Sequence, residues 1–347
     1  LESESPTDVN EVSDPNSANV WAEHSINVHD ANFLSSLAAG LTTIHVLPGS
    51  STLFGGRTVV LKNVPASTVQ GKKFPGAKQG VKIACGSNPK GNFGSKGRFP
   101  SSRMGNVAGH REGWSAARAY LESWLAYESG EKKEPPARNF KNDTLAAALY
   151  GDLSVHIHCY RSGDMAQLVD MSKEFGFQIA MFHHAVESYK ISKLLKANGI
   201  CSAVWSDWWA FKPEAFDGIR ANAAFIDTVG GCVTMHSDNR RIANHFTIEA
   251  AKAMSYGQRA GVDITPERAL RWITSTPAKV LGIDNRVGSI AAGKDADVVV
   301  WSGNPFSVYS RPEKVFVDGA LLYDRLDPTR QPFSDFELGQ PALEALP

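Results

Sequence analysis

Three side chains that could bind a metal stand at the ends of predicted β-strands, far apart in the sequence. His158 and His184 each close a predicted strand, and Asp238 follows a third one within Met235–Asn239. In a parallel barrel the C-terminal strand ends converge on one face, so these residues would meet there. Two imidazoles and a carboxylate are suitable ligands for Zn²⁺ or a similar divalent ion.

A metal at this position would have a chemical purpose. It would lower the pKa of bound water and polarise a carbonyl group. Asp238 could accept the proton of that water and pass it to a leaving amine. A single histidine at a strand end is more often structural, but three such groups at successive strand ends favour the metal interpretation.

Other histidines lie close to these positions. His156 shares a strand face with His158, so we expect it to lie deeper in the barrel. His183 alternates with His184 and is expected to pack towards the helices. His45 is expected to be a core residue or to support a residue of the site.

Lys82 lies inside the apolar run Val81–Cys85. A buried lysine is costly unless its charge is removed or paired. Carbamylation by CO₂ would give an anionic group that can bridge two metals. A strand-end lysine that reaches solvent and a lysine in a salt bridge are equally compatible with the sequence.

Further candidates for substrate contact follow the same strands. His236 precedes Asp238 by two residues, and Arg161 and Asp164 follow the strand that ends near residue 159. Arg161 and Asp164 could orient a ligand or pair with each other. Tyr189 is a weaker candidate for substrate contact.

Two segments could shape a pocket. The glycine-rich stretch 86–97 lacks the spacing of a P-loop and is expected to be a substrate-facing loop, followed by a helix around 115–127. Trp205, Trp208 and Trp209 could form an aromatic pocket wall or pack in the core.

The elements that must position these residues alternate along the chain. The predicted strands are 41–47, 58–62, 81–85, 154–159, 177–184, 200–206 and 233–236. The predicted helices among the later strands are 164–175, 188–198, 219–224 and 248–260. This alternation predicts parallel βαβ units and an α/β fold. Seven strands fit a (β/α)₈ barrel with one strand unaccounted for; an open doubly wound sheet is the alternative, although no GxGxxG follows the first strand.

The pattern of predicted helices and strands changes after residue 264. Helices are expected from Thr265 and from Thr276 to Gly282. Short strands at 288–290, 296–301, 315–317 and 320–322, with a turn at Asp318-Gly319, predict a small antiparallel β layer.

The composition excludes several classes of protein. The 36 basic residues balance the 36 acidic ones. The chain therefore lacks the excess of positive charge that is typical of nucleic-acid-binding proteins. No apolar stretch is long enough to span a membrane.

The four cysteines form no CxxC pair and sit in or beside apolar runs, which favours buried reduced thiols. The polar residues 1–20 do not resemble a signal peptide, and the compartment stays open.

At these residues the sequence resembles the amidohydrolase superfamily, in particular its imidazolonepropionase-like and dipeptidase-like members. The tail from Thr274 to Gly282 and from Val287 to Trp301 is the most characteristic part. The other segments that carry the resemblance are Gly40–Ile44, Leu47–Ser50, Val81–Ile83, His158–Arg161, His183–Glu187 and His236–Asp238.

The resemblance implies a distorted (β/α)₈ barrel with a small β-sandwich. It assigns 1–28 to a polar N-terminal segment, 29–284 to the barrel, 285–330 to the C-terminal part of the sandwich and 331–347 to a tail. By motif match His158, His184 and Asp238 correspond to metal ligands, with Asp238 also the general base. Lys82 falls where many members carry a carbamylated bridging lysine.

The sequence departs from the family pattern in two places. The His-x-His pair of the first barrel strand is not found, and the only such pair is His156-Ile157-His158. Ser87 replaces an acidic residue in a Gly-Glu-Asn-Pro-Lys motif. The chain could therefore be a piece of a binuclear enzyme, a mononuclear enzyme or an inactive relative, and an open sheet edge favours a missing segment.

The expected function is hydrolysis of a C–N bond in an amide, cyclic amide, urea or peptide by metal-activated water, with one or two divalent ions, most simply Zn²⁺. The expected partner is a small-molecule or peptide-like substrate. The sequence leaves open whether the chain forms homo-oligomers. The alternative is a truncated or inactive barrel that acts as a binding or scaffold protein.

Overall fold

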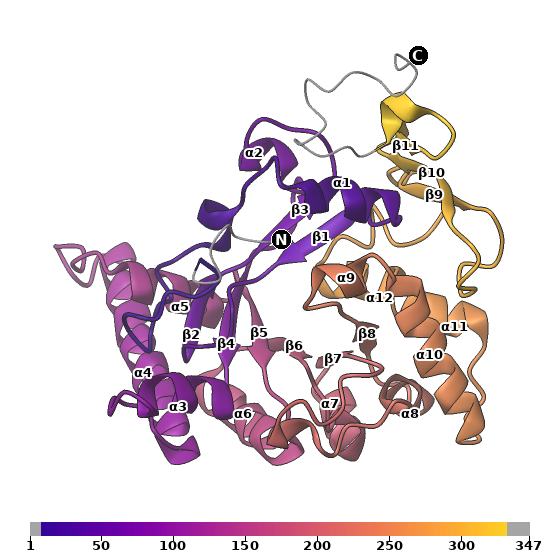
Figure 1. Cartoon of the computed structure of the whole chain (residues 1–347). Coiled ribbons are helices and arrows are strands. Elements are labelled where there is room, and N and C mark those ends of the chain that lie inside the picture. Colours follow the sequence, from indigo (N-terminus) through magenta and orange to yellow (C-terminus); the bar gives the residue numbers. More distant parts are fainter. Residues whose placement is uncertain (1–7, 332–347) are drawn as a thin grey trace.

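A six-stranded sheet forms the centre of the computed structural model, which describes residues 8–331 except for the side chains at 240 and 241. The strand order is β2-β4-β5-β6-β7-β8, in which β4 to β8 are parallel and β2 is antiparallel to β4. Helices α3 to α8 and α10 to α12 lie around the outer side of the sheet (Figure 1). Because the parallel strands β4 to β8 lie side by side in sequence order, this is the order of a (β/α)₈-type barrel and not of a doubly wound sheet. The predicted fold class is confirmed.

The bounds of the barrel elements follow the predicted alternation. The strands are β2 (Phe54–Arg57), β4 (Gly80–Ala84), β5 (Ser154–His158), β6 (Ile179–His183), β7 (Cys201–Val204) and β8 (Val233–Met235). The helices are α3 (Ser87–Gly94), α4 (Arg103–Glu128), α5 (Phe140–Tyr150), α6 (Ser162–Phe175), α7 (Ser192–Ala197), α8 (Asn222–Thr228), α9 (Arg240–Ala243), α10 (Phe246–Arg259), α11 (Pro266–Arg271) and α12 (Ser275–Val280). Short 3₁₀ turns are η1 (Ala22–Ser25), η2 (Ser188–Ile191), η3 (Pro213–Ala215) and η4 (Pro328–Arg330).

The first two predicted barrel strands lie elsewhere. β1 (Thr43–Val46) and β3 (Val59–Lys62) pair with each other as a separate antiparallel ribbon, and β1 is only partly buried. The sheet strand is instead β2, which was not among the predicted strands. Local β-propensity detects extended segments but does not state their partners, which explains this error.

The segment 86–140 is mostly helical and not an extended loop. Ser102 begins α4, because its hydroxyl accepts the Gly105 N–H at 3.1 Å. Helix α5 was not predicted. Both helices pack on the outer side of the sheet, and Trp114 of α4 is fully buried there.

The C-terminal part forms the predicted antiparallel layer. It contains β9 (Val298–Trp301), β10 (Pro312–Val317) and β11 (Ala320–Asp324) in the order β11-β10-β9. The strand expected at 288–290 is not formed. Asp318 and Gly319 both adopt left-handed backbone angles at the β10–β11 turn, as a tight hairpin requires.

This layer packs against the N-terminal part of the chain. Helix α1 (Ala31–Ala38) places Leu37 in a cluster with Val315 and Val317. Lys62 of β3 is buried and forms ion pairs with Asp295, at 2.6 Å, and with Asp318. The short helix α2 (Val69–Lys72) follows β3.

The four cysteines form two disulfides, so the expectation of reduced thiols is wrong. Cys85 and Cys159 directly follow the register pair Ala84 and His158 of β4 and β5. Cys201 and Cys232 lie beside the register pair Ser202 and Val233. Both pairs are neighbours only because two parallel strands are in register, and sequence spacing does not reveal this.

None of the helices within 8–331 is long and apolar enough to cross a membrane. The tail expected at 331–347 lies outside the described residues except for Gln331.

Candidate functional site

The predicted metal residues meet at the C-terminal ends of the parallel strands. The rings of His158 and His184 are 4.6 Å apart, and His184 Nδ1 lies 3.6 Å from Asp238 Oδ2. His236 joins them, with its ring 4.6 Å from that of His184. The spatial requirement of the sequence hypothesis is therefore met, while the role of each residue stays a proposal.

Two of these residues adopt an unusual backbone conformation. His184 has φ 55° and Asp238 has φ 50°. Non-glycine residues rarely adopt positive φ, and such strain is concentrated at functional sites. The left-handed turn at each strand end re-aims the side chain towards the strand-end cluster.

This turn also explains an error about His183. We expected it to face the helices, but its Nε2 lies 3.1 Å from Nδ1 of His156. Strict alternation holds only along a regular strand, and His184 leaves the strand with positive φ. Both histidines can therefore lie on the inner side of the sheet.

His156 lies deeper on the inner face, as predicted. Its Nε2 is 3.0 Å from Ser154 Oγ, and its ring is 4.8 Å from that of His45. His45 Nε2 is 2.9 Å from Thr58 Oγ1, consistent with the supporting position expected for it.

Several imidazole nitrogens at the site have no hydrogen-bond partner. Both ring nitrogens of His158 are unpaired, as are Nδ1 of His184 and Nε2 of His236. Burial lowers the pKa of His158 and of His184 well below its usual value, and the Lys82 ammonium adds to this effect. These imidazoles are neutral near pH 7, which is the form that binds cations.

Asp238 differs from the histidines in its exposure and in the direction of its pKa shift. Its side chain is 49% exposed and lines the cavity beside the strand ends. Burial raises its pKa to about 6, although the charges of Lys82 and Lys212 oppose this shift. A carboxylate with a pKa near neutrality is suited to accept and release a proton.

Lys82 points into the same cavity. It is 5% exposed, and its Nζ donates a hydrogen bond to the carbonyl of Pro48 at 3.2 Å. Burial lowers its pKa to about 8. The alternative in which this side chain reaches solvent is wrong, and the lowered pKa is compatible with carbamylation of the neutral amine.

The cavity has a volume of about 1340 Å³. It extends from Lys82, His184 and Asp238 to the segment around Trp21 and to α1. It lies between β8 and the N-terminal segment, where backbone bridges join Asn16 and Trp21 to β2. Within 8–331 no strand joins β8 to β2, so the sheet is open on this side.

An aromatic cluster packs against the histidines. Trp205 is buried, and its ring lies 4.7 Å from His184 and 5.0 Å from His236. Trp208 stacks on Trp205 at 4.7 Å. Trp209 is instead 59% exposed, so only two of the three tryptophans adjoin the site.

The weaker substrate candidates lie outside the cavity lining. The Tyr189 hydroxyl donates to the carbonyl of Asp217 at 3.1 Å. Asp164 pairs with Arg103 at 3.3 Å, so the suggested ion pair with Arg161 is wrong. Arg161 and Asp164 are three residues apart, which suggests contact, but the actual partner, Arg103 on α4, is visible only in the fold.

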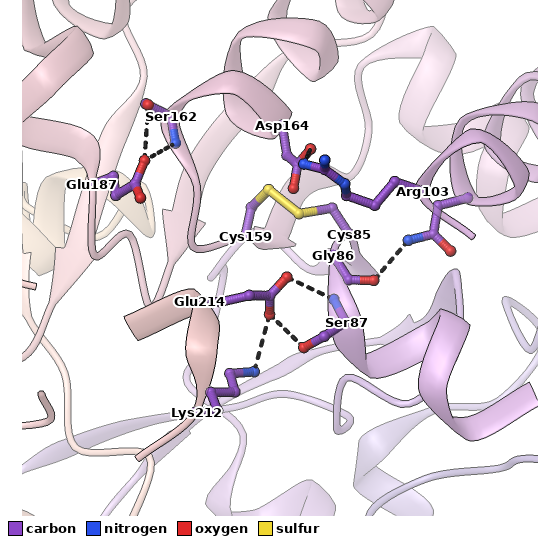
Figure 2. The surroundings of a disulfide bond; sticks show 11 residues. Cys85, Gly86, Ser87, Arg103, Cys159, Ser162, Asp164, Glu187, Lys212 and Glu214 are labelled. Carbon is purple, nitrogen blue, oxygen red and sulfur yellow. Dashed lines mark hydrogen bonds and ion pairs between the residues drawn. A yellow bond between two sulfur atoms is a disulfide. The ribbon is translucent and has the colours of Figure 1, made fainter. Parts of the chain in front are cut away.

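Sequence reasoning missed a carboxylate beside the strand ends. Glu214 is buried and accepts the Ser87 N–H at 2.8 Å as well as the Ser87 hydroxyl. Figure 2 shows Glu214 with Lys212 next to the Cys85–Cys159 disulfide. Ser87, which stands where the family motif has an acidic residue, is thus in contact with an acidic residue from a distant loop. No local pattern around Glu214 indicated this.

The donor set of the site fits a divalent cation, because buried imidazole nitrogens without partners adjoin a carboxylate. The side chains do not enclose such an ion as they stand: within 8–331 no group of three or more His, Cys, Asp or Glu is arranged to hold a metal. His158, His184 and Asp238 are the residues that would hold it.

The histidines and the aspartate lie at the C-terminal strand ends, the face on which α/β barrels carry their functional sites. The profile described as "Amidohydrolase family" matches residues 35–322. The chain therefore belongs to the amidohydrolase family.

Individual relatives agree with this assignment. The solved structure of an amidohydrolase from Thermotoga maritima superimposes with a TM-score of 0.85 at 31% identity, covering 91% of this chain and 80% of that one. Amidohydrolase tasK from Hapsidospora irregularis is 30% identical over 308 residues, or 83% of this chain, and the chain spans 31% of its length. Imidazolonepropionase from Shewanella frigidimarina matches over only 38 residues, at 58% identity, which covers 11% of this chain and 9% of that protein.

Proposed function

We propose that this chain carries the catalytic barrel of a metal-dependent hydrolase that cleaves a C–N bond in an amide, cyclic amide, urea or peptide. The observation that supports this most strongly is the meeting of His158, His184 and Asp238 at adjoining strand ends, with ring nitrogens that lack partners. A divalent cation such as Zn²⁺, when bound, lowers the pKa of water and polarises a carbonyl.

The residues of the chain supply the remaining steps. His158 and His184 are neutral and would hold the cation through their imidazole nitrogens. Asp238 accepts the proton of the attacking water, and its raised pKa lets it return that proton to the leaving nitrogen. Trp205 is buried and packs against the His184 ring, which restricts the orientation of that imidazole.

The test combines metal analysis with turnover. Purified chain is assayed by elemental analysis and against a panel of N-acyl amino acids, dipeptides and cyclic amides. Asp238→Asn should lower kcat by about 10²–10⁴-fold, since it removes a general base. Asp284→Asn, at an exposed position, is the matched control and should leave kcat unchanged.

The second candidate is a non-catalytic barrel that binds a partner. The present spacing of the side chains favours it, since they do not enclose a metal ion. Chain that takes up no zinc, manganese or iron and turns over no member of the panel would support this alternative and contradict the hydrolase.

A further inference from the structure

The connection between β7 and α8, residues 205–221, reaches across the carboxyl ends of neighbouring strands. Its η3 turn places Glu214 against Ser87, the first residue of α3. Because α3 follows β4, this contact links the end of β7 to the end of β4. The β7–α8 connection therefore passes β5 and β6, whose ends carry His158 and His184.

Glu214 holds the start of α3 through both of its carboxylate oxygens. Oε1 accepts the Ser87 N–H at 2.8 Å, and Oε2 accepts the Ser87 hydroxyl (Figure 2). Gly86 has a φ of 75°, and a Cβ at this residue would lie 2.6 Å from Oε1, so a glycine is required for the close approach. Glu214 is 6% exposed, and charge-assisted hydrogen bonds are stronger away from water.

Lys212 is the second contact point of the β7–α8 connection, and three groups surround its ammonium. Nζ donates to Asn88 Oδ1 at 2.8 Å, lies 3.4 Å from Glu214 Oε2 and lies 3.8 Å from the centre of the Tyr160 ring. The side chain is 18% exposed. An aromatic face attracts a cation at this distance, so the ammonium holds the connection on Tyr160.

Tyr160 links this contact to the strand-end cluster. Its ring lies 4.8 Å from the His158 ring in an edge arrangement and stacks on the His184 ring at 5.7 Å. Trp205, at the start of the connection, lies 5.8 Å from Tyr160 and 4.7 Å from His184. Both ring nitrogens of His158 lack hydrogen-bond partners, so packing against neighbouring rings fixes its orientation.

A second carboxylate holds a helix start in the same way, but its lysine partner lies nearer the surface. Glu187 Oε2 accepts the N–H and the hydroxyl of Ser162 at 2.9 Å each (Figure 2). Lys190, the partner of Glu187, is 34% exposed and also pairs with an exposed aspartate. Capping a helix is thus a recurring structural role, and the lysine on an aromatic ring of the cluster distinguishes Glu214.

We infer that Glu214 is a positioning residue of the strand-end site. It holds Lys212 on the Tyr160 ring and the β7–α8 connection on the start of α3, and this packing orients the His158 and His184 rings. The inference rests on the proposed function, because these two imidazoles are the ones that would hold the cation.

The test measures how fast diethyl pyrocarbonate modifies individual histidines of the full chain, read by peptide mass spectrometry. EDTA is present, so that no bound cation protects the imidazoles. His158 is 2% exposed, and its unpaired nitrogens react once the connection lifts. His156 is 1% exposed and lies deeper on the same strand, so it reports general unfolding. His29 is exposed and normalises the reagent.

Glu214→Ala should raise the rate at His158 relative to His156 about ten-fold or more. The loss of charge-assisted hydrogen bonds makes local opening of the connection more frequent. Asp217→Asn is the matched control in the same connection, since it breaks a pair with Lys190 in which the aspartate is 56% exposed. The control should leave the ratio unchanged.

Two further variants separate the contacts of Glu214. Glu214→Gln should give a smaller rise, because the amide oxygen still accepts the Ser87 N–H but no longer carries the charge that attracts Lys212. Lys212→Met should also raise the ratio, and adding it to Glu214→Ala should have no further effect, because both act through one contact. If Glu214→Ala does not fold, as judged by circular dichroism, these two single variants carry the comparison.

Binding of Zn²⁺ supplies the second readout, measured by titration in the absence of EDTA. Glu214→Ala should weaken the affinity about ten-fold, as expected when a group that orients metal ligands is removed. Asp217→Asn should leave the affinity unchanged.

The inference is overturned if Glu214→Ala leaves the ratio unchanged, or if His158 and His156 react faster together, which would show general destabilisation. A raised ratio with unaltered Zn²⁺ affinity would also overturn it, because Glu214 would then only close the site. Chain that binds no Zn²⁺ and turns over no substrate contradicts the proposed hydrolase instead. The reactivity ratio still decides in that case whether Glu214 orders the His158 ring.

Discussion

At the scale of single residues, the strand-end cluster contains several groups that a purely structural core would not retain. His158 has two unpaired ring nitrogens, and His184 and Asp238 adopt left-handed backbone conformations. Each feature costs free energy in the folded chain. They are explained most simply if the groups are held ready for a ligand.

A His183 variant tests whether the contact between His156 and His183 stabilises the fold. Replacing it with leucine would remove the partner of His156 Nδ1 in a buried environment. We expect His183→Leu to lower the free energy of unfolding by about 1–3 kcal/mol, because an unsatisfied buried group remains. Urea unfolding followed by circular dichroism measures this change.

His29 offers the control, since it is exposed. His29→Leu should change the free energy of unfolding by less than about 0.5 kcal/mol. Equal urea midpoints for the two variants would show that the His156–His183 contact contributes nothing.

At the scale of elements, the molecule joins a parallel sheet to two smaller antiparallel layers. The ribbon β1–β3 connects them, because Lys62 of β3 reaches Asp295 and Asp318 next to the C-terminal layer. Burial lowers the pKa of Lys62, but its hydrogen bonds to the two carboxylates outweigh this and raise it overall. The same contact, with Arg286, lowers the pKa of Asp295.

Lys62→Met should destabilise the chain at pH 7. The loss should be roughly 1–3 kcal/mol, less than for a fully buried pair, because Asp318 is half exposed. Because the pKa of Asp295 is lowered on folding, its contribution exists above 3.8 and disappears as the pH falls below that value. The difference between wild type and Lys62→Met should therefore shrink between pH 7 and pH 3.

Urea unfolding at both pH values checks this prediction. Lys314→Met breaks a pair with Asp324 at 2.9 Å in which the lysine is 47% exposed, and it should cost less than about 1 kcal/mol at either pH. A Lys62→Met penalty that is the same at both pH values would exclude the ion pair as its source.

The disulfides are features of the sheet. Cys85–Cys159 closes a segment of 74 residues between β4 and β5. We expect Cys85→Ala with Cys159→Ala to lower the free energy of unfolding by about 2–4 kcal/mol, since the cross-link restricts the unfolded chain. Mass spectrometry should find that maleimide labels no cysteine in denatured, unreduced protein and all four after reduction.

At the scale of the whole molecule, stability is distributed unevenly. All five residues of β4 are buried, while all four of β1 are only partly buried. The open side of the sheet and the 1340 Å³ cavity adjoin β1 and β8. The part nearest the cavity should therefore open most easily.

Hydrogen exchange followed by mass spectrometry tests this gradient. Amides of β4 and β5 should exchange only by global unfolding, while those of β1 should exchange through local opening. Uniform protection across these strands would show that the cavity does not weaken the adjoining elements.

The sequence by itself determined the order of the central elements and indicated the candidate residues that meet at the strand ends. Alternating apolar runs predicted β4 to β8, and the helix predicted over 164–175 ends at Phe175 as α6 does. His158, His184 and Asp238 were identified by their places at strand ends. These signals are local, because periodicity and caps depend on residues a few positions apart.

Only the tertiary structure decided which distant segments meet. It paired β1 with β3 outside the barrel, joined Cys85 to Cys159, turned His183 inward and placed Glu214 against Ser87. Each depends on strand register, on a left-handed turn or on a loop that returns across the molecule. No spacing in a single sequence records such contacts, because they are fixed by packing of the whole chain.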